Sequence, residues 1–588
     1  MKRELDPIQL EVMWNRLISI VSEQAAALIR ASFTTIVQET EDLSCGIFTA
    51  DANMVAQAVT GTPGHINTMA SAVKHFLRRF PKDEIRPGDV LVSNDPWLCS
   101  GHRNDFTTAS PIFRDDLLVG WAASTCHSID IGGVGFTADA HDVFEEGLGI
   151  PIMKLFDRGK PNQDLMEIIR TNVRMPKEVM GDIMAQISSQ DVCSEKLCEF
   201  MDQYGLDSIE PLAEAIFDRS EKAMRRAIEA LPDGKYSHEV FLDGFEEPIK
   251  IAVALTVKGT ELIVDHTGTS PQINRGLNVP LTYTHAYTTY PIKAVISPEV
   301  PNNEGSFRPV KFSVPERTIL NAQFPCPVQG RHLTGHFCVA AIIGALEKIV
   351  PEKTIGDGGG VYVPQWFGRT KEGKEFISNY FANGGIGARS NKDGIHAFSF
   401  PTNVKNAPVE VVESISPLFF GKKEILIDTG GIGKYRGGCG QSFTIKMTSP
   451  HPTMFSGLFE RTKFPALGRQ GGGEGKVGKF MIRDEGGKEK KAPPKTKIPL
   501  APGSWVVLNL PGGGGYGAAF ERNPEAVLDD VMKGYVSVKS AKEGYKVSLH
   551  KKKGKLMIDW GATQRMREGL KRVGKVKTRK RKGAGRAG

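Results

Sequence analysis

The sequence predicts an α+β protein of several domains, with mixed sheets, helices near the N-terminus, and a C-terminal half rich in strands and glycine. The chain has 588 residues, and roughly 100–200 residues per domain favours about three domains. Helix-like and strand-like stretches follow one another without a fixed repeat period. Glycine is abundant, at 64 residues, which we interpret as many tight turns.

Residues 1–235 are expected to form an N-terminal α+β domain. Asp6 and Pro7 suit the N-cap and the first position of a helix, and apolar residues then recur at helical spacing as far as Ile29. The elements expected after this helix are a hairpin at 45–57, a helix at 65–80, strands at 86–93, 109–113 and 117–124, and helices between 164 and 231.

The remaining residues fall into three segments. From residue 236 the pattern changes to strands, and we expect a middle α+β domain over 236–369 with a helix at 332–349. Residues 370–548 are expected to form a β-rich, glycine-rich C-terminal domain that ends with a helix at 524–533. The last segment, 549–588, is predicted to be a basic, disordered tail.

The formal net charge of +8 is concentrated in this tail. Residues 551–588 contain 15 Lys and Arg against two acidic residues, which leaves a net charge of −5 for the preceding 550 residues. The tail could contact nucleic acid or an acidic partner. From Lys575 onward it has no aromatic residue for base stacking, so a solvated arm is the favoured interpretation and nucleic acid is not an expected partner.

The sequence contains no sign of export or membrane insertion. No apolar run reaches about 18 residues, and the residues that follow Met1 lack the apolar core of a signal peptide. The eight cysteines are scattered, and none forms a C-x-x-C motif. This pattern is typical of free, buried thiols in a reducing compartment. We therefore expect a cytoplasmic protein without a membrane partner.

Polar residues gather in two short loops between residues 94 and 133. The first loop contains His102 and Asp105, and the second contains His127 and Asp130, so each pair has an i, i+3 spacing. Because each loop flanks a predicted strand, the strands could bring both loops to one edge of a sheet. Imidazole and carboxylate groups together suit Zn²⁺, Mn²⁺ or Fe²⁺. The alternative is that these residues only cap turns.

A series of short motifs occurs along almost the whole chain. The first are Asp42-Leu-Ser-Cys45, Asn94-Asp-Pro96, His102-Arg-Asn-Asp105, His127-Ser-Ile-Asp-Ile-Gly-Gly133 and Phe144-Glu-Glu-Gly-Leu148. The later ones are Asp265-His-Thr-Gly-Thr269, Pro301-Asn-Asn-Glu-Gly305, Asp428-Thr-Gly-Gly431, Arg436-Gly-Gly438 and Leu510-Pro-Gly-Gly-Gly-Gly-Tyr-Gly517. In type and order these motifs resemble the B-type chains of the hydantoinase/oxoprolinase family, and so many collinear matches make the resemblance specific.

The resemblance implies a two-part, ATP-dependent enzyme that assembles as a hetero-oligomer. An A-type partner chain binds ATP and Mg²⁺ and phosphorylates a substrate oxygen, and the B-type chain acts on the activated species. Relatives open cyclic amides such as hydantoins, 5-oxoproline and lactams, or carboxylate ketones such as acetone and acetophenone. The third alternative is a non-catalytic scaffold that has kept the fold. The chain itself lacks a P-loop, since Gly433-Lys434 is followed by Tyr435.

The resemblance also implies roles for individual residues. Asp42, His102, Asp105 and His127 are expected to bind a divalent metal (Zn, Mn or Fe). Asp130 is expected to be a fifth ligand or an acceptor that orients His127. The metal would lower the pKa of a bound water or polarise a carbonyl. In the amide-opening version, the activated water attacks the carbon of the phosphorylated amide.

Further candidates lie outside these loops. His65 could be a general base or a substrate contact, although a helix-start histidine satisfied by the backbone is an alternative. Glu146 could be a buried acid near the site, or a cap. A helix N-terminus favours anions, so a phosphorylated intermediate could bind at Arg331, His332 and His336, although ordinary surface or interface polar residues are the favoured interpretation.

Two glycine-rich segments carry weaker signals. Residues 473–478 match G-x-G-x-x-G but lead into a predicted strand, which favours a hairpin turn. Residues 512–515 could hold phosphate, although a structural turn is favoured because no Lys, Ser or Thr follows in the required place.

Overall fold

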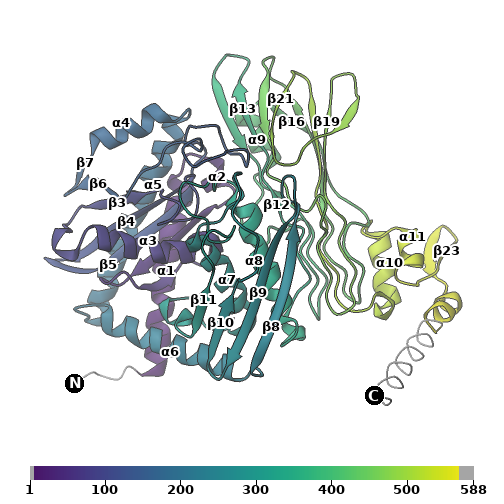
Figure 1. Cartoon of the computed structure of the whole chain (residues 1–588), viewed down its shortest axis with the longest axis horizontal. Helices are drawn as coiled ribbons and strands as arrows, with labels where there is room; N and C mark the ends of the chain where they lie inside the picture. Colours follow the sequence, from purple (N-terminus) through teal and green to yellow (C-terminus); the bar gives the residue numbers. More distant parts are fainter. Residues whose placement is uncertain (1–5, 569–588) are drawn as a thin grey trace.

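The N-terminal part is built on a seven-stranded antiparallel sheet with the strand order β2-β1-β5-β4-β3-β6-β7 (Figure 1, left). The computed structural model describes residues 6–568. The strands are β1 Leu43–Phe48, β2 Met54–Gln57, β3 Val90–Ser93, β4 Asp105–Arg114, β5 Leu117–His127, β6 Met153–Asp157 and β7 Lys160–Pro161. The helices are α1 Pro7–Ala31, α2 Thr35–Gln38, α3 Pro63–Arg79, α4 Gln163–Asn172, α5 Pro176–Tyr204 and α6 Glu210–Glu229.

Alternation along β5 places helices on both faces of this sheet. Successive side chains of a strand point to opposite faces. Trp121 and Ala123 accordingly belong to a core cluster with residues of α3, whereas Ala122 belongs to a cluster with residues of α1 and α5. Both faces of the central strands are therefore buried, and this fixes the position of the ends of β4 and β5.

The middle part packs two helices against a four-stranded sheet with the order β11-β10-β9-β8. These elements are β8 Gly234–Leu242, β9 Ile249–Lys258, β10 Glu261–Asp265, β11 Val310–Ser313, α7 Leu281–Ile296 and α8 Arg331–Leu346. The predicted domain boundary at residue 235 lies inside β8. One hydrophobic cluster nevertheless continues across it, from Ile36 through Val253 to Leu458, so residues of all three predicted domains share this core.

The C-terminal part consists of hairpins and two larger sheets (Figure 1, top right). Its strands are β12 Val361–Tyr362, β13 Gln365–Arg369, β14 Glu375–Asn379, β15 Ala382–Asn383, β16 Leu418–Ile425, β17 Gln441–Met447, β18 Thr453–Ser456, β19 Lys479–Arg483, β20 Glu489–Lys491, β21 Lys497–Leu500 and β22 Trp505–Asn509. Its helices are α9 Val409–Ile415, α10 Pro524–Met532 and α11 Val538–Glu543. These helices, strands and separate sheets confirm the α+β, multidomain prediction.

The glycine-rich segments of this part are mostly not turns, so the interpretation of glycines as tight turns holds at positions such as Gly88 and Gly259 but not for these segments. In Figure 1 they run side by side beneath β16 and β19 toward α10. Backbone hydrogen bonds join them, as from Gly513 N to Gly438 O and from Gly438 N to Ile386 O. A Cβ on Gly513 would lie 2.2 Å from Ile386 O. Glycine is therefore needed here because the backbones approach too closely for any side chain.

The predicted basic tail is partly folded. Residues 549–558 form an antiparallel hairpin of β23 Leu549–Lys552 and β24 Lys555–Ile558. Ile558 is buried in a small cluster with α10 and α11. The prediction of disorder is wrong for these residues, and residues 569–588, which carry most of the basic run, lie outside the described residues. Between residues 6 and 568, no helix has the length and apolar character needed to cross a membrane.

We predict that Gly513→Ala strongly destabilises the chain. The new Cβ would collide with the Ile386 carbonyl, and such overpacking costs about 3 kcal/mol or more. Differential scanning calorimetry should show an unfolding temperature several degrees lower. The matched control is Gly486→Ala, because Gly486 lies in an exposed turn and its nearest neighbour would be 3.4 Å away. Equal unfolding temperatures for the two variants would contradict the packing argument.

Candidate metal centre

Asp105 lies at the centre of a buried polar cluster. It is the first residue of β4, and its partner in the strand register is His127, the last residue of β5. Asp105 Oδ1 lies 2.7 Å from His102 Nε2 and 2.8 Å from His127 Nδ1. One possible donor atom from each residue lies within 4.8 Å of the other two. The fold thus brings together three of the five residues predicted as ligands.

The second oxygen of Asp105 binds two further side chains. Oδ2 lies 3.0 Å from His65 Nε2, near the start of α3, and 2.6 Å from Arg331 Nη2, at the first residue of α8. Burial by itself would raise the pKa of Asp105. The ring of His65, whose own pKa is raised, and the guanidinium of Arg331 outweigh burial and hold the pKa of Asp105 well below its usual value. Asp105 is therefore a fully buried anion.

The contacts of His102 test whether this cluster fits a cation. Its Nδ1 lies 3.1 Å from the carbonyl oxygen of Gln329, which can only accept, so Nδ1 carries the hydrogen. Burial, assisted by Arg331, lowers the pKa of His102 to about 3. The neutral ring therefore directs the lone pair of Nε2 toward Asp105 Oδ1, and Nε2 has no hydrogen-bond partner.

Two lone pairs facing each other at 2.7 Å repel unless a cation lies between or beside them. The buried Nε2 of His127 also has no partner. A set of two imidazoles and one carboxylate is typical of sites for Zn²⁺, Mn²⁺ or Fe²⁺. The residues present therefore fit the divalent metal that the sequence predicts.

The other two predicted ligands, Asp42 and Asp130, do not contact Asp105. Asp42 precedes β1, and its Oδ1 accepts a hydrogen bond from Thr62 and lies 3.8 Å from His65 Nδ1. It therefore lies next to the cluster without contacting Asp105. The carboxylate of Asp130 accepts hydrogen bonds from the side chain and backbone of Arg174 and from the backbone of Gly132. Asp130 thus anchors the loop after β5 and is not brought into the cluster.

The two predicted catalytic residues also have defined positions. His65 uses Nε2 to contact Asp105, so it orients that carboxylate. Glu146 lies outside the cavity that borders the cluster. Its Oε1 accepts hydrogen bonds from the backbone N–H groups of Val328 and Gln329. Because Gln329 O contacts His102, Glu146 supports the Asp105 cluster from the side away from the cavity.

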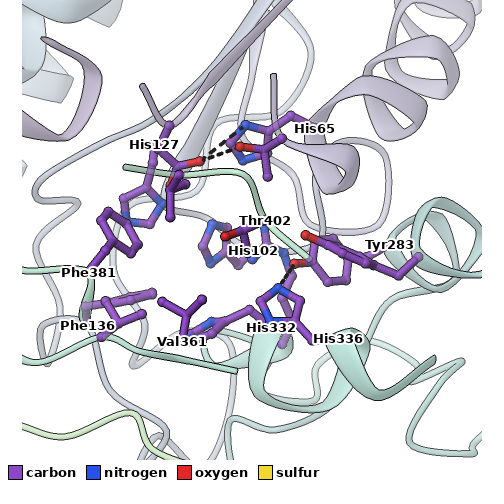
Figure 2. A pocket seen from close by; sticks show the side chains of 16 residues that line it. His65, His102, His127, Phe136, Tyr283, His332, His336, Val361, Phe381 and Thr402 are labelled. Atoms are coloured by element: carbon purple, nitrogen blue, oxygen red, sulfur yellow. Dashed lines mark hydrogen bonds and ion pairs between the residues drawn. The ribbon is translucent and has the colours of Figure 1, made fainter. Parts of the chain in front are cut away.

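A cavity of about 40 Å³ lies beside the cluster (Figure 2). All three predicted domains contribute to its walls. The cluster side is formed by Asp42, Thr62, His65, His102 and His127. The two helices of the middle part contribute Tyr283, Tyr287, Arg331, His332 and His336. The apolar side consists of Phe136, Val361, Val363, Phe381 and Val404, with Thr402 beside them.

From the sequence, a phosphorylated intermediate could bind at Arg331, His332 and His336, and the structure places these residues beside the Asp105 cluster. Arg331 neutralises Asp105, and the other two face the cavity. His332 Nε2 is buried and unpartnered. In the sequence, these three residues could be identified as site candidates because they lie together at one end of an otherwise apolar helix. The apolar residues of the cavity wall have no comparable feature in the sequence.

The glycine segment 512–515 does not form a phosphate loop in the structure. Its backbone N–H groups donate to other backbone carbonyls, as from Gly514 N to Asp357 O and from Gly515 N to Gly473 O. Residues 473–478 lead into β19, in agreement with the predicted strand. The four N–H groups of 512–515 are thus all engaged with backbone carbonyls and are not free to bind phosphate.

Comparisons with known proteins show the family of the chain. A family model described as hydantoinase B/oxoprolinase matches residues 6–519. A candidate B-type chain of a D-/L-hydantoinase from Pseudomonas sp. (strain NS671) is 31% identical over 571 residues, covering 93% of this chain and 96% of that protein.

Two solved structures have a similar fold. The crystal structure of an ATP-dependent caprolactamase from Pseudomonas jessenii has a TM-score of 0.87 and 25% identity, and the match covers 96% of this chain and 100% of that chain. A nucleotide-free structure of acetone carboxylase has a TM-score of 0.88 at 20% identity, with 98% of this chain and 84% of that chain covered. The second likeness shows the fold alone.

We predict that Glu146→Gln removes a pH dependence of stability. Burial raises the pKa of Glu146 to about 8, far above its ordinary value near 4.3. The folded chain therefore holds a proton that the unfolded chain releases, so the stabilisation present at low pH is lost as the pH rises toward 8. Gln keeps an acceptor for the two backbone N–H groups but cannot ionise.

Unfolding temperatures measured between pH 5.5 and 8.5 should therefore fall more steeply for the wild-type chain than for Glu146→Gln. Above the pKa of Glu146 the two curves should run parallel. Glu145→Gln, at an exposed neighbouring carboxylate, serves as the control and should follow the wild type. Parallel curves for the wild type and Glu146→Gln across the whole range would contradict the assignment.

Proposed function

This chain belongs to the hydantoinase B/oxoprolinase family, and on that premise we propose that it is the B-type component of an ATP-dependent enzyme that hydrolyses a cyclic amide. An A-type partner chain would bind ATP and Mg²⁺ and phosphorylate the amide oxygen. The observation that carries the proposal is the Asp105 cluster with its enclosed cavity. The glycine segment 512–515, whose N–H groups all donate to backbone carbonyls, supports a division of labour in which ATP binds elsewhere.

His102, Asp105 and His127 would hold the metal. The metal would supply Lewis-acid chemistry, by lowering the pKa of a bound water or by polarising a bound carbonyl oxygen. Other residues of the site would hold these ligands in position. Arg331 and His65 occupy the second oxygen of Asp105 and keep this carboxylate ionised and fixed in direction.

Asp42 is the second carboxylate at the site. Its position 3.8 Å from His65 Nδ1 lets it orient the side of His65 that faces away from Asp105. The apolar wall keeps bulk water away from the reacting group, which strengthens electrostatic interactions inside the cavity.

All eight cysteines are free, which supports our proposal of a reducing cytoplasmic location. Ketone carboxylation is the alternative reaction, and its support is the fold shared with acetone carboxylase. Cyclic-amide hydrolysis is favoured because the caprolactamase and the hydantoinase relative are the more similar in sequence. A non-catalytic scaffold is the third possibility.

We predict that the chain, co-purified with its A-type partner, supports ATP turnover that depends on a cyclic amide and not on bicarbonate. His102→Ala should reduce ring-opened product by at least about 100-fold, because losing a metal ligand should cost more than losing an outer partner. His141→Ala, at an exposed histidine, is the matched control and should retain activity. Unfolding temperatures of both variants check that they fold.

Other outcomes separate the alternatives. Turnover that requires bicarbonate and incorporates its carbon into product would reject hydrolysis in favour of carboxylation. Full product formation by both His102→Ala and His127→Ala would leave only the scaffold.

A further inference from the structure

The C-terminal end of the described chain is a small basic unit that the proposed function does not use. Residues 549–568, called the hairpin module below, consist of β23, β24 and a helix at 560–568. In Figure 1 the module lies at the right edge beside α10 and α11, apart from α7 and α8, which border the cavity. The family model ends at residue 519, so the family match assigns no role to the module.

The strand register gives the hairpin one buried and one exposed face. Directly paired residues of an antiparallel hairpin share a face, and successive residues alternate between faces. The pair Leu549 and Ile558 packs in the small cluster with α10 and α11. The pairs on the opposite face are all exposed, and they consist of His550 with Met557 and Lys552 with Lys555.

The hairpin module carries positive charge that the described carboxylates do not neutralise. Between residues 549 and 568 there are six Lys and Arg and two acidic residues. The ion pairs formed by the neighbouring C-terminal residues use Arg522 and Lys533. No ion pair within 6–568 includes the exposed lysines of the hairpin, which are Lys551, Lys552, Lys553 and Lys555. After residue 568 the sequence adds nine Lys and Arg and no acidic residue.

An exposed aromatic ring lies at the base of this hairpin. The N–H of Asp559 donates to the carbonyl oxygen of Ser548, which extends the ladder by one bond, and Trp560 comes next. Trp560 is 55% exposed, so a large apolar ring faces water beside unpaired lysines. The expectation of a solvated arm rests on the lack of aromatic residues from Lys575 onward, and Trp560 precedes that segment.

Three kinds of anionic partner differ in how well they fit these features. The tip of the hairpin, residues 552–555, is Lys-Lys-Gly-Lys, so it has no apolar side chain to enter a lipid bilayer. An acidic protein segment would satisfy the lysines but offers the indole no regular series of flat rings. Single-stranded nucleic acid offers both closely spaced phosphates and base rings that stack on an exposed aromatic side chain.

We propose that the hairpin module binds single-stranded nucleic acid without sequence preference. Phosphates would contact Lys552 and Lys555, and a base would stack on Trp560. Four residues separate Lys552 from Ser548 at the base of the hairpin, which is roughly 13 Å at the rise of a strand. The lysines and the indole would therefore contact different nucleotides of one strand. This inference is independent of the proposed function, and RNA and DNA share the chemistry that it requires.

Fluorescence anisotropy with the full chain and a labelled, mixed-sequence RNA tests the role of the indole. We expect a Kd of about 10 µM or tighter at low salt. Trp560→Ala should weaken binding by about fivefold or more, because base stacking on an aromatic ring is lost. Trp560→Phe should keep most of the affinity, and so should Phe419→Ala, at another exposed aromatic residue. Unchanged affinity in Trp560→Ala would overturn the inference.

The salt dependence of the same binding tests the lysines. The double variant Lys552→Gln/Lys555→Gln should flatten the plot of log K against log salt concentration by about 1.4, since each lost phosphate contact removes about 0.7 from the slope for single strands. The matched control is Lys490→Gln/Lys491→Gln, which removes two exposed lysines from β20 and should keep the wild-type slope. Equal slopes for the two double variants would contradict the assignment.

A crosslinking experiment on the wild-type chain does not depend on any variant. Ultraviolet crosslinking to RNA that contains 4-thiouridine should label peptides from 549–568, and labels found only outside the module would reject it. A DNA strand of the same sequence distinguishes the two sources, and binding of either strand supports the inference. Tighter binding to phosphatidylserine vesicles or to polyglutamate than to both strands would overturn it. Product formation by the two-component enzyme should be unchanged in all these variants, because the module lies apart from the cavity.

Discussion

The site depends on one buried charge, the carboxylate of Asp105. Burying an isolated anion has an unfavourable free energy larger than the net stability of a folded protein. The carboxylate must therefore be surrounded by compensating groups. His102 and His127 lie at one oxygen, and His65 and Arg331 lie at the other. These partners come from a loop, a strand end and the N-terminal ends of two helices.

This requirement links distant parts of the fold. Arg331 reaches Asp105 only if α8 is packed against the N-terminal sheet, and one continuous hydrophobic cluster joins these parts. Glu146 fixes the backbone before α8 through the N–H groups of Val328 and Gln329. The close-packed glycine segments support the C-terminal part, and residues between 361 and 404 form one wall of the cavity. The glycine segments thus position the apolar wall, whereas α8 and Glu146 position the charged cluster.

Contacts between residues close in sequence could be predicted, whereas contacts between residues far apart in sequence could not. The proximity of His102, Asp105 and His127 could be predicted because Asp105 and His127 lie at the ends of neighbouring strands close in sequence and His102 lies in the loop just before β4. Arg331 could not be assigned to the same site, since it lies 226 residues from Asp105 and only tertiary packing joins them. Residues 281–296 were not predicted as a helix. In α7 both polar and aromatic side chains, such as Thr284, Thr288 and Tyr287, are buried, so the helix lacks an amphipathic pattern.

The glycine-rich segments show another limit. Composition indicates flexibility or turns, but it cannot reveal that several such segments pack against one another, because each one needs the others to form. The central claim of this account is that the Asp105 cluster binds a divalent metal. Elemental analysis of the purified wild-type chain tests it most directly, alongside folded His102→Ala and His141→Ala variants. The account predicts about one Zn, Mn or Fe ion per wild-type and His141→Ala chain and almost none in His102→Ala. A fully active wild-type protein without metal, or equal metal in all three chains, would contradict it.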